Sequence, residues 1–338
     1  MNMINKITTL LLSSVCLAGI VSCSDWTRPE SLDIVYTGGV DTGSEQYAQY
    51  LDNLRDYKNA EHRLAMAFVS NERGQVPGSQ AMRLTSYPDS IDFICLENAE
   101  DLAEQYKSDI TEVHKKGTSV LYVISYEKIE GGWDAGEADD ASDDSAFLEY
   151  CSQRTGTLAA LCQTYGMDGI VITYSDPAPS SLGDAEAQRL ASRLETFFST
   201  VEAWKDANKD KYLIFKGQPA NLSDMSVLDK CDYVIVDALE AVSSVELTLA
   251  VRRAISAGMP SDRVIIGVSA HSPGVTSGEG WFTQGTPVTS VVGAADWVMD
   301  GDSFTKCGIA VSDAQNDYYN SPVFLNIRKA ITRMNSIR

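Results

Sequence analysis

Eight short runs of apolar residues recur along the chain and constrain its fold more than any other feature of the sequence. Most of them are near-continuous rather than strictly alternating, which is typical of parallel strands that are covered on both faces. We therefore predict eight buried strands. Their ranges are Leu64–Ser70, Ile91–Leu96, Ser119–Tyr126, Asp168–Tyr174, Tyr212–Lys216, Cys231–Val236, Arg263–Ser269 and Cys307–Ser312.

Longer segments with apolar residues at helical spacing fill most of the intervals between these runs. We expect helices at Ala99–Lys116, Phe147–Tyr165, Asp184–Trp204, Ser244–Ala257 and Pro322–Ile337. The interval Asn71–Ser90 carries only a weak helical pattern, and the acidic stretch Glu127–Ser145 is predicted as a long loop. Alternating strands and helices predict an α/β protein with a single (β/α)8 TIM barrel over residues 61–338. A doubly wound open sheet is the alternative.

The amino terminus has the pattern of an export signal. Lys6 precedes an apolar run from Ile7 to Val21 that is too short to span a bilayer, and Ile20-Val21-Ser22-Cys23 follows. This tetrapeptide resembles the lipobox of bacterial lipoproteins, in which the cysteine is lipidated; Cys16 would cut the apolar run in half. We expect residues 1–22 to be a signal peptide and residues 23–60 to hold the lipidated end, a tether and a first helix. The expected location is the outer membrane at the cell surface, reached through a lipid anchor. A cleaved signal with an incidental Cys23 is the alternative.

The net charge and the cysteine pattern limit the kinds of ligand that we expect the protein to bind. The formal net charge of −20 argues against nucleic acid, which needs a basic surface, and suits a neutral or weakly cationic ligand. The cysteines after Cys23 form no CxxC pair and have no histidine cluster nearby, so we expect buried thiols, no metal and no cofactor. They are Cys95, Cys151, Cys162, Cys231 and Cys307.

Polar and aromatic residues follow several predicted strands at their carboxyl ends, where the sites of barrel proteins collect. Aromatic faces stack on sugars, and amides or carboxylates bind hydroxyl groups. The candidate ligand-binding residues are Tyr126, Tyr174, Ser175, Asp176, Gln218, Asp237, His271, Trp281 and Tyr318. Trp133 and Tyr319 are further aromatic candidates, whereas Trp204 and Trp297 lie on helical stripes and are expected in the core. We expect His62 and His114 at helix surfaces or ends.

The fourth predicted strand carries a family resemblance. The segment Tyr165–Ser175 (YGMDGIVITYS) is similar to the signature YGxDGxDxDxE of glycoside hydrolase family 18, which contains chitinases and endo-β-N-acetylglucosaminidases. Asp168, Gly169 and Tyr174 match this pattern. Strands six, seven and eight resemble the family's "DY-apolar", "lG" and apolar runs in the same order. The resemblance covers the chain from about Leu64 onward and implies a barrel that binds β-linked N-acetylglucosamine.

The same strand departs from the family where the chemistry occurs. The two later aspartates of the signature are replaced by Val171 and Thr173, and the glutamate by Ser175. In the family, that glutamate is the general acid, and a serine hydroxyl cannot take its place near neutral pH. We therefore expect no catalytic residues. The expected protein binds an oligosaccharide or the glycan of a glycoprotein, such as an N-glycan core or a chito-oligosaccharide, beside a glycan-import transporter.

Two other functions stay open at this stage. An active endo-β-N-acetylglucosaminidase would need another acid, such as Asp176 swung inward by a strand bulge or the loop residue Glu127. A lipoprotein scaffold without any ligand would have a barrel with no cleft at its carboxyl end.

Overall fold

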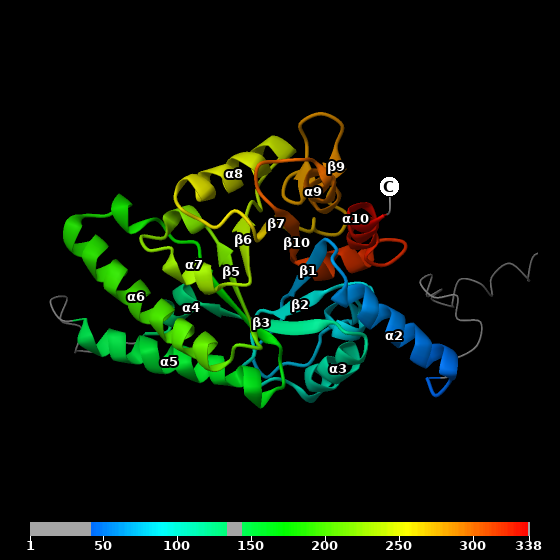
Figure 1. The fold of residues 1–338 in the computed structure, drawn as a ribbon, viewed down its shortest axis with the longest axis horizontal. Coiled ribbons are helices and arrows are strands. Elements are labelled where there is room, and N and C mark those ends of the chain that lie inside the picture. The colour runs from blue at the N-terminus through cyan, green and yellow to red at the C-terminus, as the bar shows by residue number, and fades with distance from the viewer. Residues whose placement is uncertain (1–41, 134–143, 337–338) are drawn as a thin grey trace, which may run out of the picture. The chain divides into compact units, whose positions relative to one another are not determined.

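The computed structural model describes residues 42–133 and 144–336 of the chain. Eight parallel strands close into a barrel in the order β1-β10-β7-β6-β5-β4-β3-β2, and helices surround it (Figure 1). The predicted (β/α)8 barrel is confirmed, and closure of the sheet excludes the open doubly wound alternative. Cys23 and the predicted signal peptide lie outside the described residues, so their assignments stay predictions.

Each of the eight predicted runs forms one barrel strand. The strands are β1 (Leu64–Val69), β2 (Phe93–Leu96), β3 (Ser119–Ser125), β4 (Gly169–Tyr174), β5 (Tyr212–Gly217), β6 (Tyr233–Asp237), β7 (Val264–Ser269) and β10 (Lys306–Ser312). A two-stranded antiparallel ribbon, β8 (Trp281–Phe282) with β9 (Val288–Thr289), lies in the segment between β7 and β10.

The helices are described in chain order. They are α2 (Glu45–Asn59), α3 (Glu104–Lys115), α4 (Tyr126–Gly131), α5 (Ser145–Thr164), α6 (Asp184–Ala207), α7 (Ser226–Lys230), α8 (Ser244–Ser256), α9 (Ser290–Met299) and α10 (Leu325–Asn335). No helix within these residues is long and apolar enough to cross a membrane.

Burial on both faces explains the near-continuous apolar runs. Side chains that point outward from the strands, such as Ile170 and Ile172 of β4, pack with the surrounding helices in the larger core cluster. Side chains that point inward form a second cluster inside the barrel. Its fully or almost fully buried members are Met66, Phe68, Phe93, Cys95, Leu121, Val171, Ile214, Ile235, Ile265 and Ala310.

Three aspartates tie neighbouring strands together at the amino-terminal end of the barrel. The carboxylate of Asp168, just before β4, accepts a 2.7 Å hydrogen bond from the Val120 N–H of β3 and bonds His114 of α3 at 2.8 Å. Asp92 joins Ala65 and His62 in the same way, and Asp232 joins Leu213 and Lys205. Asp168, which matches the first aspartate of the strand-4 signature, thus links β3, β4 and α3 at the end of the barrel opposite the carboxyl ends of the strands. We call these three aspartates, with the groups that they bond, the aspartate clasps.

Some local predictions were wrong. The stretch Glu127–Ser145 was predicted as a loop, but it begins within helix α4, and Ser125 caps that helix by accepting from the Lys128 N–H. Helix α9 was not among the predicted helices, although Trp297 had been placed on a helical stripe; eight of its ten residues are buried, so it lacks a polar face that would mark its extent. His62 lies in the turn after α2 rather than on a helix, with its side chain buried against Asp92.

The expected burial of the cysteines and of the helical tryptophans is largely confirmed. Cys95, Cys151, Cys162 and Cys231 are free and buried, and Cys307 is partly exposed. Trp297 is buried in the core and Trp204 packs against it. No group of three or more metal-binding side chains occurs within the described part of the chain.

Candidate functional site at the carboxyl ends of the strands

The signature row of β4 points into the barrel, as its alternation predicts. Val171 is fully buried among the inward side chains, level with Val123 of β3 and Ile214 of β5. Two residues on, Thr173 is half-buried and level with Ser125 and Lys216, and Ser175 is exposed just beyond the strand. The row that would carry three carboxylates therefore presents one aliphatic side chain and two hydroxyls.

A carboxylate from another element occupies the end of β4. Glu127, in the first turn of α4, accepts a 2.6 Å hydrogen bond from the Ser175 backbone N–H through Oε1. Its Oε2 accepts a 2.7 Å hydrogen bond from the Ser125 hydroxyl. The position of Glu127 is therefore fixed by two neighbouring strands, β3 and β4. Both carboxylate oxygens are engaged.

An ion pair lies beside the signature row. The Lys216 ammonium of β5 donates a 2.7 Å hydrogen bond to Asp237 Oδ2 at the end of β6, and both side chains are largely buried. Gln218 donates to the Asp237 backbone carbonyl at 2.9 Å. Burial raises the pKa of Asp237, and the Lys216 charge opposes that rise. The second carboxylate oxygen, Asp237 Oδ1, and the Ser269 hydroxyl are buried without a partner among the described residues.

Lys216 was not among the predicted site residues. The predicted strand ends at this residue, and the candidate polar groups were those that follow the strands. The available signal was the alternation of β5, because a side chain two residues after the inward Ile214 must also point inward.

Asp176 does not turn into the barrel row. Its side chain lines a cavity of about 330 Å³ together with Glu130 of α4 and Arg189 and Arg193 of α6, on the helix-covered side of β4. Burial raises the pKa of Asp176, and the nearby Glu127 and Glu130 raise it further. It is a carboxyl group that holds its proton more tightly than usual, outside the row in which the signature acids would stand.

Two of the aromatic candidates do not line the mouth of the barrel. Tyr126 and Tyr174 are fully buried, with ring centroids 5.8 Å apart, and their hydroxyls donate to Glu130 and to the Pro177 carbonyl. The expectation that they offer a face to a ligand is therefore wrong. They point outward from the barrel, and Tyr126, the first residue of α4, packs against Phe197 of α6. Trp133 likewise packs against Phe147.

The remaining aromatic candidates lie in the segments that follow β7 and β10. His271 and Trp281 are half-buried, with ring centroids 5.1 Å apart, and the Trp281 indole donates to the Val275 carbonyl at 3.0 Å. Tyr318 is half-buried against Phe324. Burial raises the pKa of the neighbouring Asp317. Hydrogen bonds from the Ile327 N–H, the Asn326 side-chain amide and the Asn326 N–H oppose this rise, as does the charge of His271.

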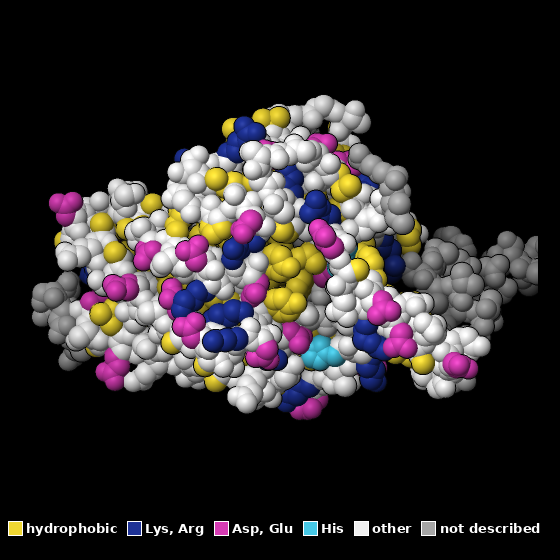
Figure 2. Space-filling model, in the orientation of Figure 1, with side chains coloured by type: hydrophobic (Ala, Val, Ile, Leu, Met, Phe, Trp, Pro, Cys, Tyr) yellow, Lys and Arg dark blue, Asp and Glu magenta, His cyan; other side chains and the backbone are white. Residues whose placement is uncertain are grey.

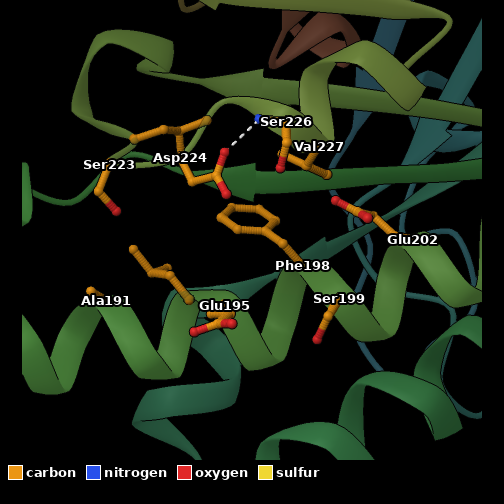
Figure 3. A pocket seen from close by; sticks show the side chains of 11 residues that line it. Ala191, Glu195, Phe198, Ser199, Glu202, Ser223, Asp224, Ser226 and Val227 are labelled. Carbon is orange, nitrogen blue, oxygen red and sulfur yellow. Dashed lines mark hydrogen bonds between the residues drawn. The ribbon is translucent and has the colours of Figure 1, made fainter.

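A separate cavity of about 350 Å³ lies outside the barrel, between α6 and the segment from Leu222 to Val227 (Figure 3). Phe198 faces it from α6, and Glu195, Glu202 and Asp224 stand around it. Asp224 accepts a 2.8 Å hydrogen bond from the Ser226 N–H. None of the predicted site residues lines this cavity.

The closed parallel barrel, with polar groups at the carboxyl ends of its strands, defines the class: a single (β/α)8 barrel. The family model described as "Glycoside hydrolase family 18, BT1044-like" matches residues 27–333. The chain therefore belongs to glycoside hydrolase family 18, and the resemblance found in strand 4 is confirmed.

Solved structures agree with the fold. A glutamate-to-glutamine variant of BT1044 is 19% identical with a TM-score of 0.66, over 87% of this chain and 94% of that one. The endo-β-N-acetylglucosaminidase from Cordyceps militaris is 18% identical with a TM-score of 0.62, over 84% and 95%. A chitinase of family 18 from Pseudoalteromonas aurantia is 13% identical with a TM-score of 0.53, over 80% and 100%. A search of curated protein sequences finds no match.

Proposed function

We propose that this protein binds a glycan at the carboxyl end of a family 18 barrel without hydrolysing it. The observation that carries the proposal is the row Val171, Thr173 and Ser175, which points to the barrel axis and contains no ionisable group. General acid catalysis needs a group that can give up a proton near the working pH, and a serine hydroxyl is no such acid.

The Lys216–Asp237 pair supports the same proposal electrostatically. Cleavage in this family proceeds through a positively charged oxazolinium, as the resemblance implies, and carboxylates in the β4 row would stabilise it. Here the side chain level with Thr173 on the neighbouring strand is a lysine, and the carboxylate bonded to it is already neutralised. The pair has no net charge, so it offers no unpaired carboxylate that would stabilise a positively charged intermediate.

The proposed ligand contains N-acetylglucosamine, as in an N-glycan core or a chito-oligosaccharide. A solved structure with the same fold is that of a Cordyceps militaris endo-β-N-acetylglucosaminidase variant in complex with fucosyl-N-acetylglucosamine-Asn. In this chain, Trp281, His271 and Tyr318 are the aromatic groups that we assign to the ligand. Gln218, Asp237 and Ser175 are the polar groups assigned to it.

Calorimetry with a panel of N-glycans and chito-oligosaccharides tests this assignment. We expect a saturable signal for at least one member and a loss of about tenfold in affinity in Trp281→Ala, the cost of one aromatic contact. Tyr50→Ala is the matched control, because Tyr50 is an exposed aromatic residue on α2, away from the β7 loop. Silence across the whole panel would favour a scaffold without a ligand.

A hydrolase that uses a different acid is the second candidate. Two observations favour it: Glu127 is fixed at the end of β4 by the Ser175 N–H, and the pKa of Asp176 is raised, as a general acid requires. Release of free oligosaccharide from a glycoprotein, abolished by Asp176→Asn or Glu127→Gln but not by Asp224→Asn, would establish this candidate. Asp224 is the control because it lies by the separate cavity outside the barrel.

We also propose that Cys23 carries a lipid that anchors the protein to the outer membrane at the cell surface, beside a glycan-import transporter. The sequence Ile20-Val21-Ser22-Cys23 after a short apolar run supports it. Metabolic labelling with an alkyne fatty acid tests the anchor. Cys23→Ser should lose the label and leave the membrane fraction, whereas Cys16→Ser should keep both. A label that survives in Cys23→Ser contradicts the assignment.

A further inference from the structure

A second cavity opens at the amino-terminal end of the barrel, opposite the proposed glycan site. Its volume is about 510 Å³, and its lining comes from the end of α2 and the turn after it and from the starts of β1, β2, β3, β5, β6 and β10. On the face shown in Figure 2, hydrophobic side chains gather over the strands, between acidic and basic side chains. The amino-terminal end of a barrel usually serves stability alone.

The floor of this cavity is aromatic. Tyr212 and Tyr233 are half-buried and pack on the cluster inside the barrel. Phe93 lies under both, edge-on to Tyr212 at 5.0 Å and to Tyr233 at 6.2 Å between ring centroids. Neither tyrosine hydroxyl makes a hydrogen bond within residues 42–133 and 144–336, so both are available as donors to a bound molecule. Burial raises the pKa of Tyr233 to about 12, so its hydroxyl keeps its proton.

The rim has positive groups with unused donors. Arg63 lines the cavity, and its guanidinium makes no hydrogen bond or ion pair to any described residue, although its backbone is held by Asn335. Lys58 donates to the Thr118 hydroxyl at 2.5 Å and lines the same cavity. Burial lowers the pKa of Lys58 to about 8, opposed by the charges of Asp92 and Asp89. A nearby anion would therefore favour its charged form.

The acidic groups of the lining are largely engaged or turned to solvent. Both carboxylate oxygens of Asp92 are bonded, Oδ2 to the Ala65 N–H and Oδ1 to His62, whose other ring nitrogen bonds the Ala60 carbonyl. Glu61 is exposed. The charged groups of the lining that keep free hydrogen-bonding capacity are thus donors, one guanidinium and part of one ammonium, and the two phenolic hydroxyls can donate beside them.

We infer that this cavity is a second binding site, for a small organic carboxylate that has a flat apolar face. The ring or chain of such a molecule stacks on Tyr212 and Tyr233, and its carboxylate pairs with the Arg63 guanidinium, which is shaped for two-point binding of a carboxylate. The site is separate from the proposed glycan site and does not depend on it.

Ligand-observed saturation-transfer NMR and titration with the full-length protein test the inference. The probes are phenylacetate and glucuronate, with phenylacetamide and glucose as their uncharged counterparts. We expect saturation transfer to at least one carboxylate and weaker transfer to its counterpart. Arg63→Gln should weaken carboxylate binding about tenfold or more, the typical effect of losing a charged hydrogen-bond partner.

Two control variants test whether the carboxylate binds in this cavity rather than elsewhere on the protein. Arg252→Gln removes an exposed guanidinium on α8 and should leave carboxylate binding unchanged. Trp281→Ala alters the opposite end of the barrel and should also leave it unchanged. The inference is overturned if neither carboxylate binds, if Arg63→Gln binds as tightly as the wild type, or if the uncharged counterparts bind equally well.

Discussion

At position 175, a serine stands where the family 18 signature has its glutamate. The side chain that should deliver a proton is a serine hydroxyl, and its backbone N–H is engaged by Glu127. The change is accompanied by Val171 and Thr173 in the same inward row, and by Lys216 beside them on β5. Where the family signature has a row of carboxylates, this chain has a row of neutral side chains next to the Lys216–Asp237 ion pair.

The Lys216–Asp237 pair can be tested by removing one partner. Lys216→Met should destabilise the protein by about 3 kcal/mol or more, because it leaves a buried carboxylate without its partner. In Lys216→Met/Asp237→Asn the buried charge is gone, so a large part of that loss should be recovered. Urea denaturation of the three proteins measures both effects. Equal stability of Lys216→Met and wild type would show that the pair is not formed in solution.

The residues of the site were only partly predictable from sequence. Alternation along β4 correctly placed Val171 inside the barrel, because successive side chains of a strand point to opposite faces whatever the rest of the chain does. Tyr126, the first residue of α4, and Tyr174 are buried against each other, and Tyr126 also packs on Phe197 of α6, which is distant in sequence. No pattern within strands β3 and β4 encodes that contact. The bond between Glu127 and Ser175 joins two strand ends 48 positions apart, which sequence spacing does not reveal.

Among the elements, β6 and β7 meet at Gly267, where the Asp237 carboxylate occupies the space that a side chain would fill. A Cβ at this position would overlap Asp237 Oδ1 and approach the Ile235 side chain. Gly267→Ala should therefore push the Asp237 carboxylate away and destabilise the protein by about 1–3 kcal/mol.

The control is Gly156→Ala on the exposed side of α5, where a Cβ meets nothing within 4 Å. This substitution should be neutral or stabilise by up to about 1 kcal/mol, since alanine favours a helix. Thermal denaturation compares the two variants. A Gly267→Ala protein as stable as Gly156→Ala would contradict the close contact between the two strands.

The clasp of Asp92 and His62 between β1 and β2 predicts a pH dependence. The hydrogen bond to Asp92 is the main cause that raises the His62 pKa above its ordinary 6.5, and burial opposes it. Because the folded state holds the proton more tightly, the stabilisation is complete below pH 6.5 and is lost as the pH rises through the raised value.

His62→Gln should remove this part of the pH dependence. We expect the stability difference between wild type and His62→Gln to shrink as the pH rises from about 5 to about 8, the range in which histidines titrate. Denaturation midpoints of both proteins across this range measure it. A difference that stays constant or grows with pH would contradict a proton held by Asp92 and His62.

The elements themselves were highly predictable where periodicity or burial is strong. All eight runs became barrel strands, since a parallel strand buried on both faces leaves an apolar run that is hard to mistake. Helix α9, which follows the β9 strand and is apolar on most sides, and the short α4 lacked such a signal.

Taken as a whole molecule, the barrel has two ends with different chemistry. The carboxyl end carries the neutral signature row, the Lys216–Asp237 pair and the aromatic loops after β7 and β10. The amino-terminal end carries three aspartate clasps and an aromatic cavity with a free guanidinium. Membership of family 18 accounts for the fold and for the position of the proposed site at the carboxyl end of the barrel. The substitutions of this chain in the β4 row are the reason that we propose glycan binding there instead of cleavage.

Native mass spectrometry of the full protein with an N-glycan that contains the N-acetylglucosamine core distinguishes binding from cleavage in a single experiment, because it reports both. We predict a complex whose mass equals the protein plus the intact oligosaccharide, unchanged after prolonged incubation. Shortened oligosaccharide products that disappear in Asp176→Asn or Glu127→Gln would contradict binding without hydrolysis.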